Sequence, residues 1–468
     1  MGRTRTAPAG KWRHQLAAVL LLCIPGFSAA AETATPDAGI PGMKTHRIEE
    51  PVFGGHMVIY EAGRGQARSV LLVHGIGPGG ARDWREAVGW LQSSFHVVAV
   101  DLPGFGASDK ANVLYSPANY ASVLKHVADR FLRRPFALVG HSMGAVVALR
   151  YAATYPQDVE RLVVVDAPGI LQRYSVTSQF LAYLGMEFMP PWLDLLERFA
   201  NLARAVLAPL ERLQFEPQVI LASPQLRDRL LGGDPVKIAG LAVASEDLST
   251  DLRKVRAETL ILWGSKDTLA PLRTGRVLAL KLPRARLEVI EGAAHMPMFE
   301  APERFSALLV SFLQFGLPPA PPVSAAPAVK HGTMNCLQES NLVFEGDYDS
   351  LTIDGCAQVQ IRNARVRELR VLDSTVTIDD SHVGQSGGTG LVARNSTVVA
   401  TGVRFEGEVA ITALDSRLDL AAVDVEGSKA AVTSPTRSYV VFSLSRVDSP
   451  YTRGDVHAFF TVTPANPL

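Results

Sequence analysis

The chain has 468 residues, of which 47% are hydrophobic and 20% charged, and its 46 basic residues balance its 46 acidic ones. This length exceeds one ordinary core, so we expect two or three domains of globular composition rather than a disordered protein. The zero net charge excludes the basic excess that is typical of nucleic-acid-binding proteins, so we expect no nucleic-acid partner.

Residues 1–31 have the pattern of a secretory signal peptide, because a basic stretch precedes a short apolar run and then small residues. The basic residues are Arg3, Arg5, Lys11 and Arg13, the apolar run is "LAAVLLLCIPGF", and "SAAAETATP" follows. The run is shorter than the about 20 apolar residues of a membrane span, and a lipid anchor on Cys23 would need a small residue where leucine stands. We therefore expect cleavage after Ala30 or Ala31 and an exported protein, either periplasmic or secreted.

Residues 45–315 alternate short apolar runs with helix-like segments, which is typical of an α/β domain and predicts such a domain over residues 32–315. Runs such as "SVLLVHG", "FHVVAVDLPG", "FALVGHS" and "TLILWG" are mostly apolar and end in glycine or a turn. Strands of this kind are buried on both faces of a parallel sheet. The segments "SPANYASVLKHVADRFL" and "APERFSALLVSFLQF" have helical periodicity, so we expect helices on both faces of that sheet.

One sharp turn after a strand carries the first candidate catalytic residue. "LVGHSMGAVVALRYA" places Ser142 between a strand-like and a helix-like run, with Gly140 and Gly144 two positions away on each side. The serine either caps the helix in a tight turn or stands on a nucleophile elbow, where the glycines let the backbone bend and expose the hydroxyl. The motif alone does not decide between the two interpretations.

Residues 169–251 break the alternation, because they contain long amphipathic segments and no convincing strand. We interpret them as a helical cap, which would exclude water and shape an apolar pocket. Extra helices packed elsewhere on the domain are the alternative. The candidate pocket residues are Phe180, Leu184, Phe188, Met189 and Trp192, although core packing within the cap would explain the same pattern.

Two further candidates follow later strands. "LILWGSKDTLAP" places Asp267, and "LEVIEGAAHMP" places His295, after strands whose carboxyl ends share an edge with Ser142. A serine hydroxyl needs a base, and the base needs an orienting acid; Ser, Asp, His is the chain order that accompanies a nucleophile elbow. Asp166 in "VVVDAPG" is the rival acid.

An oxyanion formed at this serine would need two backbone N–H donors. One belongs to Met143, which follows the serine, and we assign the other to Ile76 in the glycine-rich loop "VHGIGPGG". The sequence has no HExxH or CxxC spacing and no phosphate-binding loop, so we expect neither a metal nor a cofactor.

Together, "VHGIGPGG", "DLPGFGASD", "GHSMG", "LILWGSKD" and "GAAHMP" resemble the α/β-hydrolase superfamily of serine hydrolases over residues 45–315. The "HGxGPG" form with "GHSMG" is similar to the meta-cleavage product hydrolases and related esterases. The resemblance implies catalysis by Ser142, His295 and Asp267 through an acyl-enzyme. We expect a small-molecule ester or lipid-like substrate with an apolar group. A carbon–carbon bond hydrolase and an inactive hydrolase that binds the envelope are the alternatives.

The segment 316–330 is rich in proline and alanine, which predicts an extended linker. Residues 331–468 contain short alternations of Val, Ile and Leu and a repeat that places four serines in register, namely Ser374, Ser396, Ser416 and Ser438. Their spacings of 22, 20 and 22 residues predict stacked coils, as in a right-handed parallel β-helix. A β-sandwich is the alternative.

The same register reaches Cys356 and Cys336, the two cysteines that remain after signal cleavage. Adjacent coils stack about 4.8 Å apart, which suits a disulfide between equivalent positions. Export makes the oxidation available. We therefore predict a bridge between the two.

Four arginines gather in "IRNARVRELR" at positions Arg362, Arg365, Arg367 and Arg370. A solvated outer face is the interpretation we favour. Contact with an anionic envelope partner, such as a polysaccharide, is the alternative.

Overall fold

The computed structural model describes residues 39–172, 217–317 and 329–468. Its first half contains an eight-stranded sheet with the order β1-β2-β4-β3-β5-β6-β7-β8. The strands are β1 (Lys44–Glu50), β2 (Gly55–Ala62), β3 (Ser69–Val73), β4 (His96–Asp101), β5 (Phe136–His141), β6 (Val159–Val165), β7 (Glu258–Gly264) and β8 (Ala285–Ile290). From β4 to β8 in this order all neighbours are parallel.

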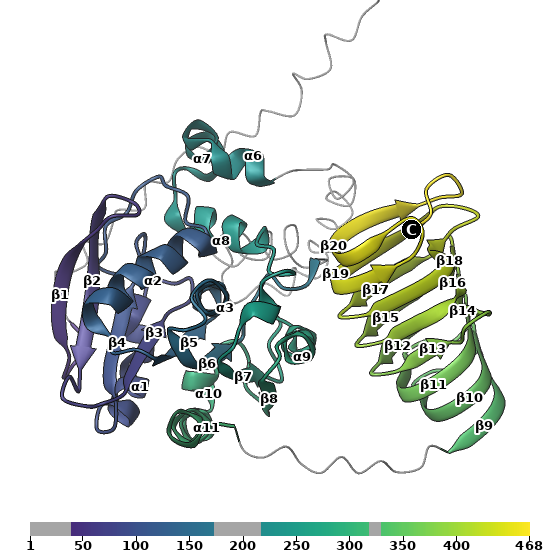
Figure 1. Cartoon of the computed structure of the whole chain (residues 1–468), viewed down its shortest axis with the longest axis horizontal. Helices are drawn as coiled ribbons and strands as arrows, with labels where there is room; N and C mark the ends of the chain where they lie inside the picture. Colours follow the sequence, from purple (N-terminus) through teal and green to yellow (C-terminus); the bar gives the residue numbers. More distant parts are fainter. Residues whose placement is uncertain (1–38, 173–216, 318–328) are drawn as a thin grey trace, which may run out of the picture. The chain divides into compact units, whose positions relative to one another are not determined.

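Helices cover both faces of this sheet, because its central strands are apolar on both sides (Figure 1). In β3, Leu71 and Val73 belong to one core cluster, and Val70 and Leu72 belong to another. The first cluster includes side chains of α2 (Pro117–Phe131), α3 (Met143–Thr154) and α9 (Leu272–Lys281); the second includes side chains of α1 (Arg85–Leu91) and α11 (Pro302–Phe315). The α/β fold predicted from the alternation of strands and helices is therefore confirmed.

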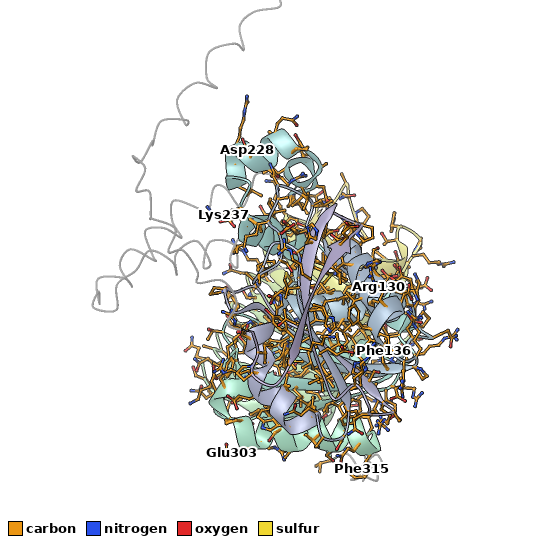
Figure 2. All side chains as sticks on the ribbon, turned by 90° about the vertical axis from the view of Figure 1, so that its left-hand side faces the viewer. Arg130, Phe136, Asp228, Lys237, Glu303 and Phe315 are labelled. Atoms are coloured by element: carbon orange, nitrogen blue, oxygen red, sulfur yellow. A yellow bond between two sulfur atoms is a disulfide. The ribbon has the colours of Figure 1, made fainter. Side chains whose placement is uncertain are left out.

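Side chains fill the space between the sheet and its helices (Figure 2). Phe136, at the start of β5, lies within this packing and is fully buried, whereas Phe315, at the end of α11, lies at the rim and is 79% exposed. Figure 2 also shows Asp228 and Lys237 on helices beyond the sheet. The central strands thus supply a rigid platform for the loops at their carboxyl ends.

The sheet departs from an all-parallel arrangement at one edge. β1 pairs antiparallel with β2, and β2 pairs antiparallel with β4. The sequence "KTHRIEE" of β1 is mostly polar and its side chains are largely exposed, so it lacks the apolar run by which the other strands were recognised. An edge strand can be this polar because it packs on few neighbours.

The region predicted to form a cap contains helices and no strand within its described residues, 169–172 and 217–251. They are α6 (Pro217–Ala222), α7 (Pro224–Leu231), α8 (Pro235–Ala244) and the short 3-10 helix η4 (Leu252–Lys254) just after it. Ser223 caps α7 and Asp234 caps α8 through a side-chain oxygen, with proline in the first turn of each helix. The predicted pocket residues Phe180, Leu184, Phe188, Met189 and Trp192 lie outside the described residues. In the part of the chain that the structure covers, no helix is long and apolar enough to cross a membrane.

The second half, residues 329–468, is all-β with parallel strands (Figure 1). Its strands are β9 (Lys330–Leu337), β10 (Val343–Asp354), β11 (Val359–Leu372), β12 (Thr375–Asp379), β13 (His382–Gly384), β14 (Thr389–Arg394), β15 (Thr397–Thr401), β16 (Arg404–Leu414), β17 (Arg417–Ala421), β18 (Asp424–Thr433), β19 (Ser438–Asp448) and β20 (Arg453–Val462). Only β20 pairs antiparallel, with β19. A separate apolar core lies between the strands.

The four serines predicted to be in register form a ladder of hydrogen bonds. The N–H of Ser374 donates to Ser396 Oγ, that of Ser396 to Ser416 Oγ, and that of Ser416 to Ser438 Oγ, each at 3.1 Å. The hydroxyls of Ser374, Ser396 and Ser416 in turn donate to the carbonyl two residues earlier, at 2.6 to 2.7 Å. All four residues are buried. The hydroxyls of Ser374, Ser396 and Ser416 each satisfy two backbone groups at a corner that the strands leave unpaired.

The residue before each of the first three ladder serines bends the chain. Asp373, Asn395 and Asp415 have φ values of 48°, 47° and 48°, in the left-handed region where Asp and Asn are tolerated best. Gly355, before Cys356, has φ 64°. The corner therefore combines a bending residue with a following residue that faces inward.

The predicted disulfide between Cys336 and Cys356 is present, with a Cα–Cα distance of 6.6 Å. Both cysteines are buried, and Cys356 N–H donates to Ser374 Oγ at 2.8 Å, which makes Cys356 the next rung of the ladder. The bridge thus links strand β9 to the first corner of the repeat.

The four arginines of β11 and its surroundings are all exposed. Arg362 pairs with Glu345 at 2.6 Å and Arg367 with Asp349 at 3.1 Å. Exposed pairs of this kind contribute little to stability.

Candidate active site

Ser142 stands on a strained turn between β5 and α3. Its φ and ψ are 51° and −123°, a region that costs about 1–3 kcal/mol for a residue other than glycine. The side chain makes no capping bond to the helix that it precedes. Of the two interpretations of the motif, the geometry agrees with the elbow and not with a helix cap.

The two glycines of the motif are required by close backbone contacts. A Cβ on Gly140 would lie 2.2 Å from the carbonyl oxygen of Gly144, and a Cβ on Gly144 would lie 2.4 Å from that of Val73. Neither distance is accessible to a real side chain. The helix therefore packs directly on the end of β3, and this packing fixes the bend at Ser142.

Ser142, His295 and Asp267 form a chain of hydrogen bonds although they come from three separate loops. His295 Nε2 lies 3.0 Å from Ser142 Oγ, and His295 Nδ1 lies 2.8 Å from Asp267 Oδ2. Ser142 is 7% exposed, and the Asp267 side chain is fully buried. In this arrangement Nδ1–H donates to the carboxylate, which leaves Nε2 free to accept the serine proton.

Backbone amides hold the Asp267 carboxylate in place. Its Oδ1 accepts the N–H of Leu269 at 2.8 Å and that of Ala270 at 2.9 Å, so Oδ2 is left for the histidine. The rival acid, Asp166, is bonded elsewhere, because its Oδ1 accepts the N–H of Gly264 at 3.0 Å. The structure thus brings Asp267, and not Asp166, onto the imidazole.

A second histidine, His141, supports the loop that carries His295. His141 Nε2 lies 2.7 Å from the carbonyl oxygen of His295, so this nitrogen carries a proton and donates it. Burial, reinforced by His295 nearby, lowers the pKa of His141 to about 3. His141 therefore stays neutral and adds no positive charge beside the imidazole of His295.

Glu300, on the short helix α10 (Pro297–Glu300), holds the backbone on both sides of His295. Its carboxylate accepts the N–H of Ala294 and, at 3.3 Å, that of Met296. With these bonds the loop has little freedom to move the imidazole away from Ser142.

The two residues assigned to an oxyanion hole flank Ser142. Met143 is the first residue of α3, so its N–H belongs to the first turn, where amides have no partner within the helix. Ile76 lies in the loop after β3, next to Gly75, and a Cβ on Gly75 would lie 2.8 Å from the Cβ of Ser142. Both amides therefore belong to segments in close contact with the serine.

His74 fixes this loop. Its Nδ1 lies 2.6 Å from the carbonyl of Gly75, and its Nε2 accepts the N–H of Leu102 at 3.0 Å. One nitrogen donates and the other accepts, so the ring is neutral, in keeping with burial, which lowers its pKa.

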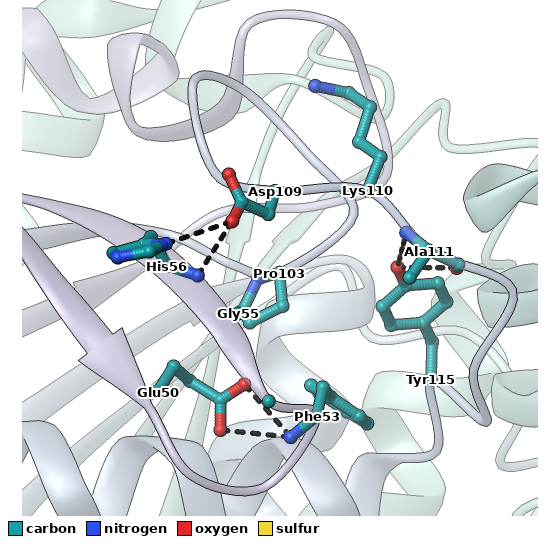
Figure 3. A pocket seen from close by; sticks show the side chains of 10 residues that line it. Glu50, Phe53, Gly55, His56, Pro103, Asp109, Lys110, Ala111 and Tyr115 are labelled. Atoms are coloured by element: carbon teal, nitrogen blue, oxygen red, sulfur yellow. Dashed lines mark hydrogen bonds and ion pairs between the residues drawn. The ribbon is translucent and has the colours of Figure 1, made fainter.

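A separate pocket of about 380 Å³ lies beside the β1–β2 turn (Figure 3). None of the three residues Ser142, Asp267 and His295 lines it. Figure 3 shows that its carboxylates already have partners: Glu50 accepts the N–H of Phe53 at 3.0 Å, and Asp109 accepts that of His56 at 2.8 Å. We therefore do not assign it to the chemistry at Ser142.

Within residues 39–172, 217–317 and 329–468, no group of three or more His, Cys, Asp or Glu side chains could hold a metal ion.

Sequence reasoning missed His141 and Glu300 as members of this site. His141 precedes Ser142 in the motif "GHSMG" and Glu300 lies five residues after His295, so both stood close to recognised positions. Their roles depend on carbonyl and amide groups of a loop folded back from another part of the chain, which spacing alone does not reveal.

The part of the chain that carries the site is similar to known proteins. A family model described as "Alpha/beta hydrolase family" matches residues 70–308. The chain is 28% identical over 262 residues to an uncharacterized protein of Mycobacterium tuberculosis, covering 53% of this chain and 76% of that protein.

Two relatives named as hydrolytic enzymes are similar over comparable shares of the chain. A monoacylglycerol lipase of Xenopus laevis is 28% identical over 289 residues, covering 57% of this chain and 82% of the lipase. A 2-hydroxy-6-oxononadienedioate/2-hydroxy-6-oxononatrienedioate hydrolase of Paraburkholderia phymatum is 30% identical over 267 residues, covering 54% and 89%. Among solved structures, a meta-cleavage product hydrolase of Pseudomonas fluorescens is similar at 23% identity and a TM-score of 0.43, covering 57% of this chain and 97% of that one.

Proposed function

Because the chain belongs to the alpha/beta hydrolase family, we propose that it is a serine hydrolase that cleaves carboxylic esters with an apolar group. The observation that carries this proposal is the hydrogen-bonded chain Ser142–His295–Asp267, with distances of 3.0 and 2.8 Å. The same residues were predicted from the order Ser, Asp, His in the sequence.

In the first step, His295 Nε2 takes the proton of Ser142 Oγ as the oxygen attacks the ester carbonyl carbon. The imidazolium that forms is stabilised by the carboxylate of Asp267, which accepts its Nδ1–H. The carbonyl oxygen becomes an oxyanion, for which the N–H groups of Met143 and Ile76 are the proposed donors.

In the second step, the tetrahedral intermediate collapses, the carbon–oxygen bond to the alcohol breaks, and His295 returns the proton to the leaving alkoxide. Water then attacks the acyl-enzyme, again with His295 as the base. The bond from the acyl carbon to Ser142 Oγ breaks, His295 returns the proton to Ser142 Oγ, and the carboxylic acid leaves. The neutral His141 beside this ring is important here, because a second positive charge would oppose formation of the imidazolium.

A second candidate substrate is a meta-cleavage product, favoured by the 30% identity to the Paraburkholderia phymatum hydrolase named for such compounds. The attacked carbonyl would then be that of a ketone, and a carbon–carbon bond would break. An inactive hydrolase domain that binds the envelope is the third candidate. The intact hydrogen-bonded chain weighs against it.

The test is a panel of p-nitrophenyl esters of increasing chain length together with 2-hydroxy-6-oxononadienedioate, measured on the wild type and on Ser142→Ala. A fluorophosphonate probe should add its mass to Ser142 and to no other serine. Turnover of the dienedioate alone would replace the ester proposal with the second candidate. Absence of both labelling and turnover would favour the binding protein.

We further propose that a helical cap over about residues 169–251, including α6 to α8, forms the apolar side of the substrate pocket. α8 supports this proposal, because a Cβ on Gly240 would lie 3.8 Å from Cδ1 of Ile76, beside the proposed oxyanion loop. The lipase relative is consistent with a lipid-like substrate.

Export is likewise a proposal, which rests on the signal-peptide pattern of residues 1–31 and on the disulfide between Cys336 and Cys356. Amino-terminal sequencing of the mature protein should find a start at Ala31 or Glu32.

For the C-terminal half we propose a right-handed parallel β-helix, with envelope or polysaccharide contact as its candidate role. The support is that two series of parallel-paired strands have the same number of residues between paired positions. β12, β15, β17 and β19 pair in parallel through Thr375, Thr397, Arg417 and Tyr439. β13, β16, β18 and β19 pair through His382, Arg404, Asp424 and Arg446. Both columns advance by 22, 20 and 22 residues. A crystal structure in which the first and last strands paired into a closed barrel would overturn this proposal.

A further inference from the structure

Asp166 is a buried acid that the mechanism above does not use. It follows β6, is 0% exposed and has φ 46°. Its N–H donates to the carbonyl of Leu262 on the neighbouring strand β7, at 3.2 Å. Asp166 is thus fixed beside the strand end from which the Asp267 loop departs.

The two carboxyl oxygens of Asp166 differ in their surroundings. Oδ1 accepts the N–H of Gly264, whereas Oδ2 is buried and receives no N–H or O–H from the described residues. Asp267 is anchored on the same residue, because its N–H donates to the carbonyl of Gly264 at 3.2 Å. The charge of Asp267 therefore acts on Asp166. Two buried carboxylates held this close together would repel each other, so one of the two acids carries a proton.

The surroundings of the pair show which acid carries it. Asp267 accepts two backbone N–H bonds and the Nδ1–H of His295, and all three favour its ionised form. Asp166 has a single N–H donor. Burial first, and then the charge of Asp267, raise the pKa of Asp166 to about 9, and Glu300 on α10 acts in the same direction.

We propose that Asp166 is a positioning residue, which in its neutral form donates a hydrogen bond to the carboxylate of Asp267 and holds it against His295. A carboxylate has about four acceptor sites. Three on Asp267 are filled by Leu269, Ala270 and His295, and the hydroxyl of Asp166 fills the fourth. The inference rests on the proposed function, because the role of Asp267 is defined by the chemistry at Ser142.

Ionisation of Asp166 would remove this donor and place two negative charges in contact. The repulsion would displace Asp267, and His295 would lose the orientation that its base function requires. We therefore expect turnover by the wild type to fall as the pH rises through about 9, the pKa of Asp166.

Two substitutions at Asp166 distinguish its role as a hydrogen-bond donor from its role in the backbone turn. Asp166→Asn keeps the shape, tolerates the positive φ, cannot ionise and offers an amide N–H in place of the hydroxyl. Asp166→Gly also tolerates the positive φ but offers no donor. Alanine is unsuitable because it would add backbone strain at φ 46°.

Asp166→Asn should keep kcat within a few-fold of the wild type at pH 7 and should lack the alkaline loss near pH 9. Asp166→Gly should lose kcat by roughly 10- to 100-fold, with a smaller change in KM. Equal losses in both variants, or the same alkaline profile in the wild type and Asp166→Asn, would overturn the proposal. The comparison of the wild type with Asp166→Asn decides the matter even where Asp166→Gly does not fold.

The proton on Asp166 is also measurable without turnover. The infrared band of a protonated carboxyl group should be present in the wild type at pH 7 and absent in Asp166→Asn. Because the folded-state pKa lies above the ordinary value of 3.8, folding retains a proton between about pH 4 and pH 9. As the pH rises through this window, the melting temperature of the wild type should therefore fall relative to that of Asp166→Asn. A missing band would reject the inference alone, whereas failure of fluorophosphonate labelling at Ser142 would reject the proposed function.

Discussion

The two halves of the chain use serine at a strand end for opposite purposes. In the α/β half, Ser142 itself takes the left-handed conformation, with φ 51°, and its hydroxyl is presented to His295. In the C-terminal half, the residue before the serine takes that conformation, as Asp415 does before Ser416. The hydroxyl of Ser416 then faces inward and binds two backbone groups.

The difference shows that the position of the bending residue determines whether the serine hydroxyl is exposed to a base or buried against the backbone. Where the serine bends the chain, strain and close glycine packing hold the hydroxyl at the surface of the turn, available to a base. Where the preceding Asp or Asn bends the chain, the serine is an ordinary buried donor and acceptor. Substitutions in both halves can test this comparison.

The largest effect is expected for Ser142→Ala, which should reduce turnover by about 10⁶-fold, because Ser142 is the nucleophile of the proposed mechanism and no other group can replace it. The melting temperature should change little, because Ser142 makes no capping bond. A steady-state assay with the preferred ester and a thermal melt measure the two effects.

Ser416→Ala is the matched control, since it removes a serine hydroxyl at a strand end of the other half. It should leave turnover unchanged. A loss of turnover in this variant would contradict the separation of roles between the two kinds of serine.

The disulfide is expected to have the next largest effect. It closes a loop with a separation of 20 residues, which in the chain-entropy model stabilises by about 3 kcal/mol. Replacing both cysteines by serine should lower the free energy of unfolding of the C-terminal half by that amount, measured by urea unfolding under oxidising conditions. Turnover at Ser142 should stay unchanged, and a parallel loss of activity would show that the two halves unfold as one.

A smaller loss of stability is expected from Ser416→Ala itself. The N–H of Ser396, which donates to Ser416 Oγ at 3.1 Å, would stay buried without a partner. An unsatisfied buried N–H costs about 1–3 kcal/mol. Hydrogen exchange should also be faster at the Ser396 amide, and protection equal to that of the wild type would mean that another acceptor replaces the hydroxyl.

The smallest effect, of opposite sign, is expected for Ser142→Gly. Glycine adopts the positive φ without strain, so the folded protein should become more stable by about 1 kcal/mol although activity is lost. The equivalent change in the ladder, Ser416→Gly, should destabilise. If both changes destabilise, the strain at Ser142 is not stored in its backbone.

Much of this architecture could be predicted from the sequence, because it depends on local patterns. Gly140, Ser142 and Gly144 specify the bend by their spacing. The 20- to 22-residue period specifies which serines are neighbours. The strand β1 could not be found in this way, since an exposed edge strand with the sequence "KTHRIEE" has no apolar pattern.

The protonation state of Asp166 could not be predicted from the sequence either. An aspartate after a strand has the same local pattern whether it orients a histidine or supports another acid. Which of the two it does depends on burial and on Asp267, which comes 101 residues later in the chain and determines where the proton resides.

The serine ladder bears on how the C-terminal half can change over evolution. Between neighbouring rungs the bond is always from the N–H of one serine to the hydroxyl of the next, so the inner rungs present the same donor and acceptor to their neighbours. Duplication or deletion of one 20- to 22-residue unit would therefore leave all remaining rungs matched. Selection can lengthen or shorten this half of the molecule one unit at a time, without redesigning its core.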